Sequence, residues 1–179
     1  MQIPLPNKKY NIIYADPAWS YRDKASAGKR GASYKYVTQT QDWICNLPVK
    51  DIAATDCVLF IWVTMPKLDQ VMKVIELWGF TYKTCAFTWV KRNKKKPTWF
   101  MGMGSWTRAN SEICLLATKG KPKRLSASVL SVIDEPIEHH SKKPDCVRDK
   151  IVELCGDLPK IELFARNKTE GWDVWGNEV

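Results

Sequence analysis

The chain has 179 residues, of which 45% are hydrophobic and 26% charged, as expected for a single globular domain with a sizeable core. Its 28 Lys+Arg and 19 Asp+Glu give a net charge of +9, which favours a polyanionic partner such as nucleic acid over a membrane surface. No apolar run approaches the ~20 residues of a membrane span, and the polar N-terminus does not resemble a secretory signal, so a cytoplasmic protein is expected.

The first predicted element is a short buried strand over residues 11–15, which stops abruptly at Asp16-Pro17-Ala18-Trp19. Pro17 fixes its own φ and biases Asp16 toward an extended conformation, so the strand ends in a carboxylate and a rigid corner. Ligands of open α/β sheets bind outside such strand ends. The Asp16 carboxylate, a free carbonyl and the flat Trp19 ring could together hold a planar group that carries an NH₂. The alternative for Asp16 is an ordinary Asx-type turn.

The rest of the chain alternates between apolar runs and helical periodicity. Residues 20–37 form a long loop after the corner, interpreted as a substrate lid with disorder as the alternative. A helix is expected from residue 40, followed by a second short element after Leu47-Pro48. Further strands are predicted over 57–63, 82–90, 113–117 and 161–165, with 125–133 compatible with another, and helices over 66–78 and 146–155. Strand, helix and strand in succession indicate a βαβ unit, and therefore a parallel sheet in an α/β fold.

The six cysteines form no Cys-x-x-Cys pair, and four of them lie in or beside apolar runs. They are interpreted as reduced, buried thiols of a cytosolic protein rather than as disulfides or zinc ligands. The only histidines, His139 and His140, are adjacent, and neighbouring residues on a strand point to opposite faces. No metal site is expected.

Two basic loops, 22–30 and 91–96, are the predicted nucleic-acid surface, because lysine and arginine contact phosphates. Trp99, Phe100 and Trp106, which follow the second loop, could stack on or wedge beside an extruded base, with ordinary packing equally open for Trp106. The nearby Gly102-Met103-Gly104 follows no strand and is assigned no phosphate-binding role. The basic residues are Arg22, Lys24, Lys29, Arg30, Lys91, Arg92, Lys94, Lys95 and Lys96.

Blocks along nearly the whole chain resemble, in order, the N6-adenine methyltransferases with an Asp-Pro-Pro-Trp motif, the family whose eukaryotic members methylate messenger RNA. The first block is Asp16-Pro17-Ala18-Trp19, in which Ala18 replaces the second proline and puts the rigidity of the corner in doubt. The others are Leu47-Pro48-Val49, 59–64, 110–120, 140–145 and 162–166, followed by Gly171-Trp172 and Gly176-Asn177. The resemblance implies a Rossmann-like methyltransferase fold, a mostly parallel sheet flanked by helices, with a permuted order of motifs in one domain over residues 1–179.

The resemblance implies catalytic roles for Asp16, Pro17 and Trp19. The Asp16 carboxylate and the Pro17 carbonyl would each accept one N–H of the target amine, and Trp19 would stack on the base. It also implies S-adenosyl-L-methionine as the methyl donor. Lys143 would hold its methionine carboxylate, although without the family it would read as a surface lysine. The full set of implied cofactor-binding residues is Asp16, Lys143, Glu162, Leu163, Arg166, Asn177 and Glu178, whereas Phe164 is expected to be core.

Three alternatives to N6-adenine methylation of DNA stay open. RNA is one, although the absence of an appended RNA-binding module favours a microbial or phage-like enzyme acting on DNA. N4-cytosine methylation is another, disfavoured by Asp16 because Ser tends to mark cytosine enzymes. The third is a catalytically silent nucleic-acid-binding paralogue, which typically lacks the catalytic Asp or the cofactor residues. Since relatives often pair, a homodimer is also expected to be possible.

Overall fold

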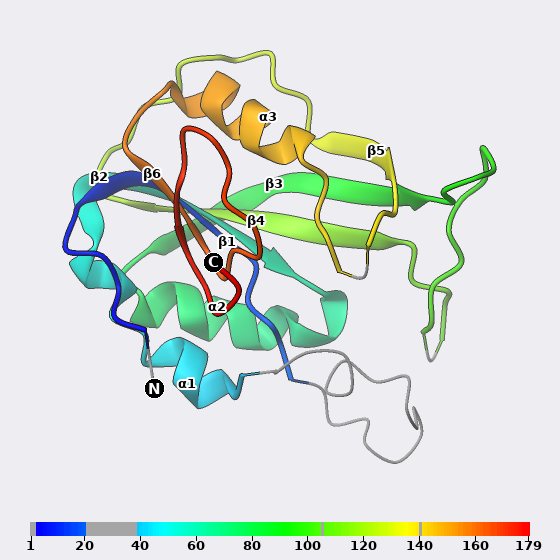
Figure 1. Ribbon diagram of the computed structural model, residues 1–179, viewed down its shortest axis with the longest axis horizontal. Coiled ribbons are helices and arrows are strands. Elements are labelled where there is room, and N and C mark those ends of the chain that lie inside the picture. Colours follow the sequence, from blue (N-terminus) through cyan, green and yellow to red (C-terminus); the bar gives the residue numbers. More distant parts are fainter. Residues whose placement is uncertain (1–2, 21–38, 105, 140) are drawn as a thin grey trace.

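The computed structural model describes residues 3–20, 39–104, 106–139 and 141–179. One seven-stranded sheet in the order β5-β3-β4-β2-β1-β6-β7 forms its centre (Figure 1). The strands are β1 (Tyr10–Ala15), β2 (Ala53–Val63), β3 (Thr81–Arg92), β4 (Ser111–Lys119), β5 (Val132–Pro136), β6 (Lys160–Leu163) and β7 (Asp173–Trp175). The helices are α1 (Gln41–Cys45), α2 (Leu68–Leu77) and α3 (Cys146–Cys155), with short 3₁₀ turns at Val49–Asp51 and Met65–Lys67.

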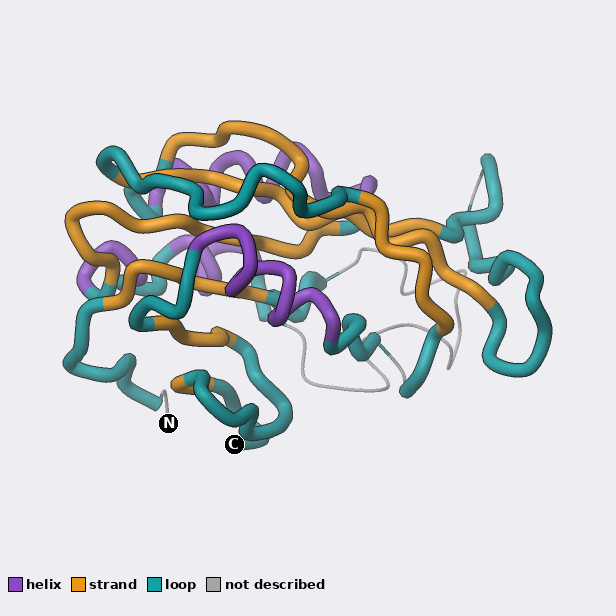
Figure 2. The backbone as a smooth tube through the Cα atoms, turned by 90° about the horizontal axis from the view of Figure 1, so that it is seen from above, coloured by secondary structure: helices purple, strands orange, loops and turns teal. Residues whose placement is uncertain are grey.

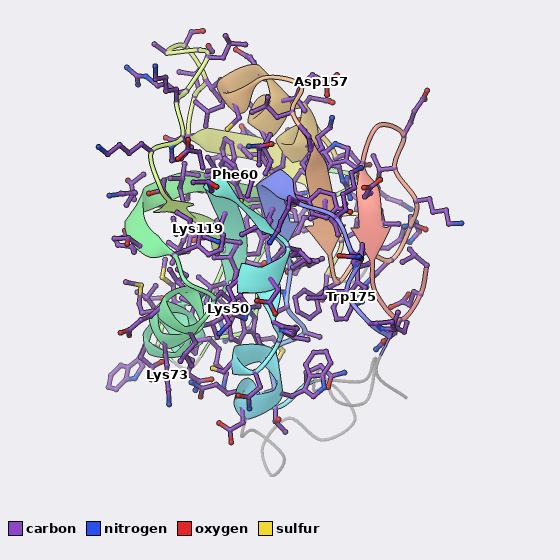
Figure 3. All side chains as sticks on the ribbon, turned by 90° about the vertical axis from the view of Figure 1, so that its left-hand side faces the viewer. Lys50, Phe60, Lys73, Lys119, Asp157 and Trp175 are labelled. Atoms are coloured by element: carbon purple, nitrogen blue, oxygen red, sulfur yellow. The ribbon has the colours of Figure 1, made fainter. Side chains whose placement is uncertain are left out.

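Helices cover both faces of the sheet, with α1 and α2 on one side and α3 on the other (Figure 1). Alternate residues of β1 serve the two layers: Ile13 packs in the core beneath α1 and α2, and Ile12 in the core beneath α3. Figure 3 shows Phe60 of β2 between the α2 side, marked by Lys73, and the α3 side, marked by Asp157. The central strands are therefore buried on both faces, which explains why β2 reads as a continuous apolar run.

All described strands point the same way except β4, which runs antiparallel to both β2 and β3. The predicted strand–helix–strand unit is present as β2-α2-β3, but β4 lies between its two strands. This mostly parallel sheet with helices on both faces confirms the expected Rossmann-like α/β fold. In the described part of the chain, no helix is long and apolar enough to span a membrane.

The strands predicted over 57–63, 82–90 and 113–117 are longer in the structure, and two other predicted strands are shorter. The strand expected over 125–133 is wrong for most of its length: Leu125 and Leu130 are exposed, and β5 begins only at Val132. Its charged outer residues belong to an edge strand, which an apolar pattern does not reveal. The strand expected over 161–165 ends at Leu163, because Phe164 turns the chain with φ of 65°.

Candidate active site

The carboxyl ends of the parallel strands meet at one edge of the sheet, as expected for a ligand site in an α/β fold. Asp16 follows β1, Thr64 follows β2 and Phe164 follows β6, while the reversed β4 begins at this edge with Glu112 as its second residue. The edge is hollowed by a cleft of about 530 Å³. Its described lining is Asp16, Pro17, Ala18, Trp19, Gln39, Trp43, Trp62, Val63, Thr64, Glu112, Ser141, Lys143, Phe164, Ala165, Arg166, Trp175, Gly176, Asn177 and Glu178.

The Asp-Pro corner places the Asp16 carboxylate in the lining of this cleft. The Asp16 backbone N–H donates to the Leu163 carbonyl (3.4 Å), which continues the pairing of β1 with β6 by one residue. The Pro17 carbonyl accepts from the Trp19 N–H (2.9 Å). Because a carbonyl has two lone pairs, this bond leaves the Pro17 oxygen able to accept a second donor.

Trp19 is more buried than a freely exposed stacking platform would be. The residue is 5% exposed, and its indole N–H donates to the Trp62 carbonyl (3.1 Å). Trp19 therefore belongs to the core and presents only a small part of its surface to the cleft. The indole hydrogen bond fixes the orientation of that part.

A chain of alternating charges connects Asp16 to β3 and β4. We call Asp16, Lys143, Glu112 and Lys91 the Asp16 cluster. The Lys143 ammonium lies 2.8 Å from Asp16 Oδ2 and 3.3 Å from Glu112 Oε2, and Lys91 binds the other oxygen of Glu112. Lys143 also lies over the Trp62 ring, 5.5 Å from its centroid. Two cations balance two anions, so the cluster is neutral as a whole.

Burial and pairing pull the pKa values of this cluster in different directions. Burial raises the pKa of Asp16 above its usual 3.8, although Lys143 opposes the shift. Burial also disfavours the charged forms of Glu112 and Lys143, but there the opposite charges prevail. The pKa of Glu112 is consequently held below 4.5, and that of Lys143 is raised above 10.5.

Glu112 was not singled out from the sequence, although it lies inside a block that carries the family resemblance. An acidic residue at the start of an otherwise apolar strand was the available signal. Lys143 and Glu112 side chains are 11% and 15% exposed. Lys143 is therefore no solvated surface lysine.

The chain after β7 supplies the far wall of the cleft. Gly176 is buried there, and a Cβ on it would lie 2.2 Å from the Ala165 carbonyl oxygen, so only glycine allows this approach. The close contact places Asn177 and Glu178 beside Arg166, which is ion-paired with Glu178 at 3.7 Å. Three predicted cofactor residues are thus brought together.

The other two predicted cofactor residues lie differently. Glu162 lines an adjoining cleft of about 740 Å³, where Arg148 holds its carboxylate through bonds of 2.7 and 2.9 Å. Burial raises the pKa of Glu162 despite Arg148. The Leu163 side chain is fully buried and lines neither cleft, so any contact with a ligand would fall to its backbone. The sequence analysis did not identify Arg148, which stands three residues after Asp145 and binds it at 2.8 Å.

The sequence suggested that Phe164 is simply a core residue, but the structure does not support this. Phe164 lines both clefts and packs edge-on against Trp43 and Trp175. Phe164 and Ser141, which also lines both clefts, have φ of 65° and 60° and are the only non-glycine residues with positive φ in the described ranges. Such backbone strain concentrates at functional sites.

The predicted nucleic-acid surface is described only in part. Arg22, Lys24, Lys29 and Arg30, with the lid expected over 20–37 apart from Ser20, lie outside the described residues. Lys91 and Arg92 belong to β3 rather than to a loop, and both bind acids of the protein itself, Arg92 pairing with Asp134. Lys94, Lys95 and Lys96 are exposed.

The expectation of reduced thiols and no metal can be compared with the described residues. All six cysteines are free, and burial raises the pKa of those most deeply enclosed, such as Cys57 and Cys114. Within the described ranges, no group of His, Cys, Asp and Glu is arranged to hold a metal ion.

The chain is similar in sequence to several known methyltransferases. The chain is 37% identical over 193 residues to the Type II methyltransferase M.MunI of a Mycoplasma species, covering 98% of this chain and 80% of that protein. It is 29% identical to the human N(6)-adenosine-methyltransferase catalytic subunit METTL3 and 28% identical to an MT-A70-like N(6)-adenosine-methyltransferase of Arabidopsis thaliana. Those two alignments cover 96% and 95% of this chain but only 28% and 24% of the longer proteins.

A family model described as MT-A70 matches residues 10–178, nearly the whole chain, including the Asp-Pro corner and the segment after β7. The match confirms the resemblance that the sequence blocks indicated. The chain belongs to the MT-A70 family of N6-adenine methyltransferases.

Proposed function

We propose that this protein transfers a methyl group from S-adenosyl-L-methionine to the N6 amine of adenine in DNA, with the Asp16 corner as the catalytic centre. The observation that carries the proposal is the position of the Asp16 carboxylate, at the end of β1 and within hydrogen-bonding distance of Lys143 in the main cleft. The 37% identity to a Type II methyltransferase over most of both chains favours DNA over RNA as the substrate. The same similarity favours a microbial cytoplasm as the setting of the reaction.

The exocyclic amine of adenine is a poor nucleophile, because its lone pair is delocalised into the ring. Asp16 and the second lone pair of the Pro17 carbonyl would each accept one N–H and so favour a pyramidal nitrogen. As the N–C bond forms, one N–H proton must leave. Asp16 is the acceptor placed for it, and its raised pKa makes it a stronger base than an exposed aspartate.

The donor set of the cleft fits the proposed cofactor, which would supply an electrophilic methyl group on a sulfonium. Lys143 offers a cation suited to a carboxylate, and its pairing with Asp16 and Glu112 fixes the position of that charge. Arg166, Asn177 and Glu178 offer the mixed donors and acceptors that a ribose diol needs. The role of the chain's own residues is mainly alignment, because the transfer needs an in-line approach.

The test measures methyl transfer from labelled cofactor to duplex DNA, single-stranded DNA and RNA in parallel, with mass analysis of the nucleosides. Asp16→Asn removes the carboxylate but keeps its shape, and should lower kcat/KM by about 10²- to 10³-fold. Asp69→Asn, at an exposed position on α2, is the matched control and should leave activity unchanged.

Each outcome of this test separates two readings. N6-methyladenine in DNA, lost in Asp16→Asn, supports the proposal; methylation of RNA alone or of cytosine N4 assigns a different substrate. Cofactor binding is measured separately by calorimetry. If the wild-type protein showed neither methyl transfer nor cofactor binding, it would be a silent nucleic-acid-binding protein rather than an enzyme.

A further inference from the structure

The connection between β3 and β4 leaves the sheet at the edge that carries Asp16. We call its described residues, 93–104 and 106–110, the arm. The arm projects beyond the end of the sheet (Figures 1 and 2). Its base is tied to the site, because Lys91 of β3 binds Glu112 of β4 and Glu112 binds Lys143.

The first half of the arm is a built turn. The Asn93 side-chain amide donates to Thr98 Oγ1 (2.9 Å) and to the Trp99 carbonyl (3.0 Å), and the Asn93 backbone N–H donates to the Thr98 carbonyl (2.9 Å). These bonds close the chain around Lys94, Lys95 and Lys96. All three lysines are exposed on the turn, and none has an ion-pair partner among the described residues.

The second half of the arm contains Gly102 and Gly104, the pair to which the sequence analysis assigned no phosphate-binding role. Its backbone geometry explains why glycine stands at both positions. A Cβ on Gly102 would lie 1.9 Å from the Ala109 carbonyl oxygen, and one on Gly104 would lie 2.0 Å from that of Thr107. The two passages of the chain therefore run backbone against backbone, an approach that only glycine permits. Just beyond this contact, Trp106 is 99% exposed.

The composition of the arm identifies its partner. Residues 93–110 contain three lysines and one arginine and no acidic residue. The arm also carries four exposed apolar side chains, Trp99, Met101, Met103 and Trp106. A single strand or a distorted duplex of nucleic acid offers both phosphates for the cations and flat base faces for the aromatic rings. A second copy of this chain, with a net charge of +9, would instead repel the arm.

We propose that the arm is the element that grips nucleic acid, with the Lys94–Lys96 turn on phosphates and Trp106 stacked on a base next to the target. The placement next to the target rests on the proposed function of the Asp16 site. The gripping role does not, because it follows from the exposure and charge of the arm itself.

The phosphate half of the proposal is tested by the salt dependence of binding. Fluorescence anisotropy of a labelled duplex and a labelled single strand gives the slope of log K against log salt concentration, with no methyl transfer needed. Lys94→Ala with Lys95→Ala should make the slope less steep by nearly 2, at about 0.9 for each lost contact with duplex phosphate. The control pair, Lys121→Ala with Lys123→Ala, removes the same charge from exposed positions after β4, which ends at the opposite edge of the sheet. Equal slopes for the two pairs would overturn the proposal.

The stacking half is tested with Trp106→Ala, which should weaken binding about tenfold or more, whereas Trp106→Phe keeps a flat ring and should restore most of it. Tyr82→Ala removes another exposed aromatic, at the start of β3 and away from the site edge, and should have no effect. A 2-aminopurine beside the target adenine should lose its quenching in Trp106→Ala. Wild-type affinity in Trp106→Ala overturns the proposal, and so does a change in sedimentation without loss of anisotropy, which would assign the arm to a second copy. If these variants behave as expected in a protein that transfers no methyl group, the nucleic-acid-binding role of the arm stands, whereas the proposed function and the placement of Trp106 next to the target fail.

Discussion

The Asp16 cluster and the arm lie at the same edge of the sheet, yet they hold their charges in opposite ways. In the cluster, two lysines and two carboxylates are each mostly enclosed, with 11% to 27% of the side chain exposed, and balance one another. In the arm, four cations stand on exposed positions with no acidic residue between Asn93 and Asn110. Enclosed ion pairs fix the positions of their groups, because an enclosed charge without its partner costs much free energy. Exposed cations need no partner within the protein, so their charge stays available for a ligand.

The same substitution in both regions gives the largest expected contrast. Lys143→Met leaves Asp16 and Glu112 without their shared cation, and should lower the free energy of unfolding by about 3–5 kcal/mol at pH 7. Lys95→Met, in the arm, should change it by less than about 0.5 kcal/mol. Urea denaturation of both variants measures the difference. Equal losses would show that Lys143 is energetically a surface lysine.

The loss of unfolding free energy in Lys143→Met, called the deficit below, should depend on pH, and this dependence sharpens the contrast. In the wild-type protein Lys143 has a raised pKa, so its contribution is fully present below 10.5 and is lost as the pH rises through the folded value. Glu112 has a lowered pKa, so its contribution is present above 4.5 and is lost as the pH falls. The deficit should therefore be largest between these limits and shrink as the pH falls through the folded pKa of Glu112, where this carboxylate becomes neutral.

Variants of Arg148 and Glu162 test whether an enclosed ion pair also stabilises the protein at the second cleft. Arg148→Met leaves Glu162 buried without its guanidinium, and should cost about 3 kcal/mol of unfolding free energy. Arg148→Met with Glu162→Leu replaces both charges by apolar groups and should recover most of that loss. A double variant as unstable as the single one would mean that packing around Arg148, not the ion pair, provides the stability.

At the wall of the main cleft, we expect a smaller effect on stability than at the two enclosed ion pairs. Gly176→Ala forces a Cβ against the Ala165 carbonyl and should cost about 1–3 kcal/mol while moving Asn177 out of place. Gly171→Ala is the control, because its Cβ meets nothing within 4 Å and only its positive φ of 74° is strained. Calorimetry with S-adenosylhomocysteine should show weaker binding for Gly176→Ala and unchanged binding for Gly171→Ala. Similar affinities of the two variants for S-adenosylhomocysteine would show that the Gly176 contact does not contribute to cofactor binding.

Local sequence was sufficient for most of the elements and for the corner at Asp16-Pro17. The apolar run of β2, the 3.6-residue periodicity of α2 and α3, and the strand stop at Asp16-Pro17 are properties of neighbouring residues, and the structure contains them all. The ordered blocks then identified the family, because several short matches in the right order are far more specific than one tetrapeptide. Where the local signal was weak, at the charged edge strand β5, the prediction was wrong.

Tertiary structure alone decided which charges meet. Asp16 and Lys143 are 127 positions apart in the chain, and Glu112, which joins them to Lys91, arrives on the one described strand that runs backward. The same holds for the burial of Trp19 and for the backbone contacts that require Gly102, Gly104 and Gly176. These are distances across the fold, and both desolvation and Coulomb energies depend on such distances rather than on sequence separation.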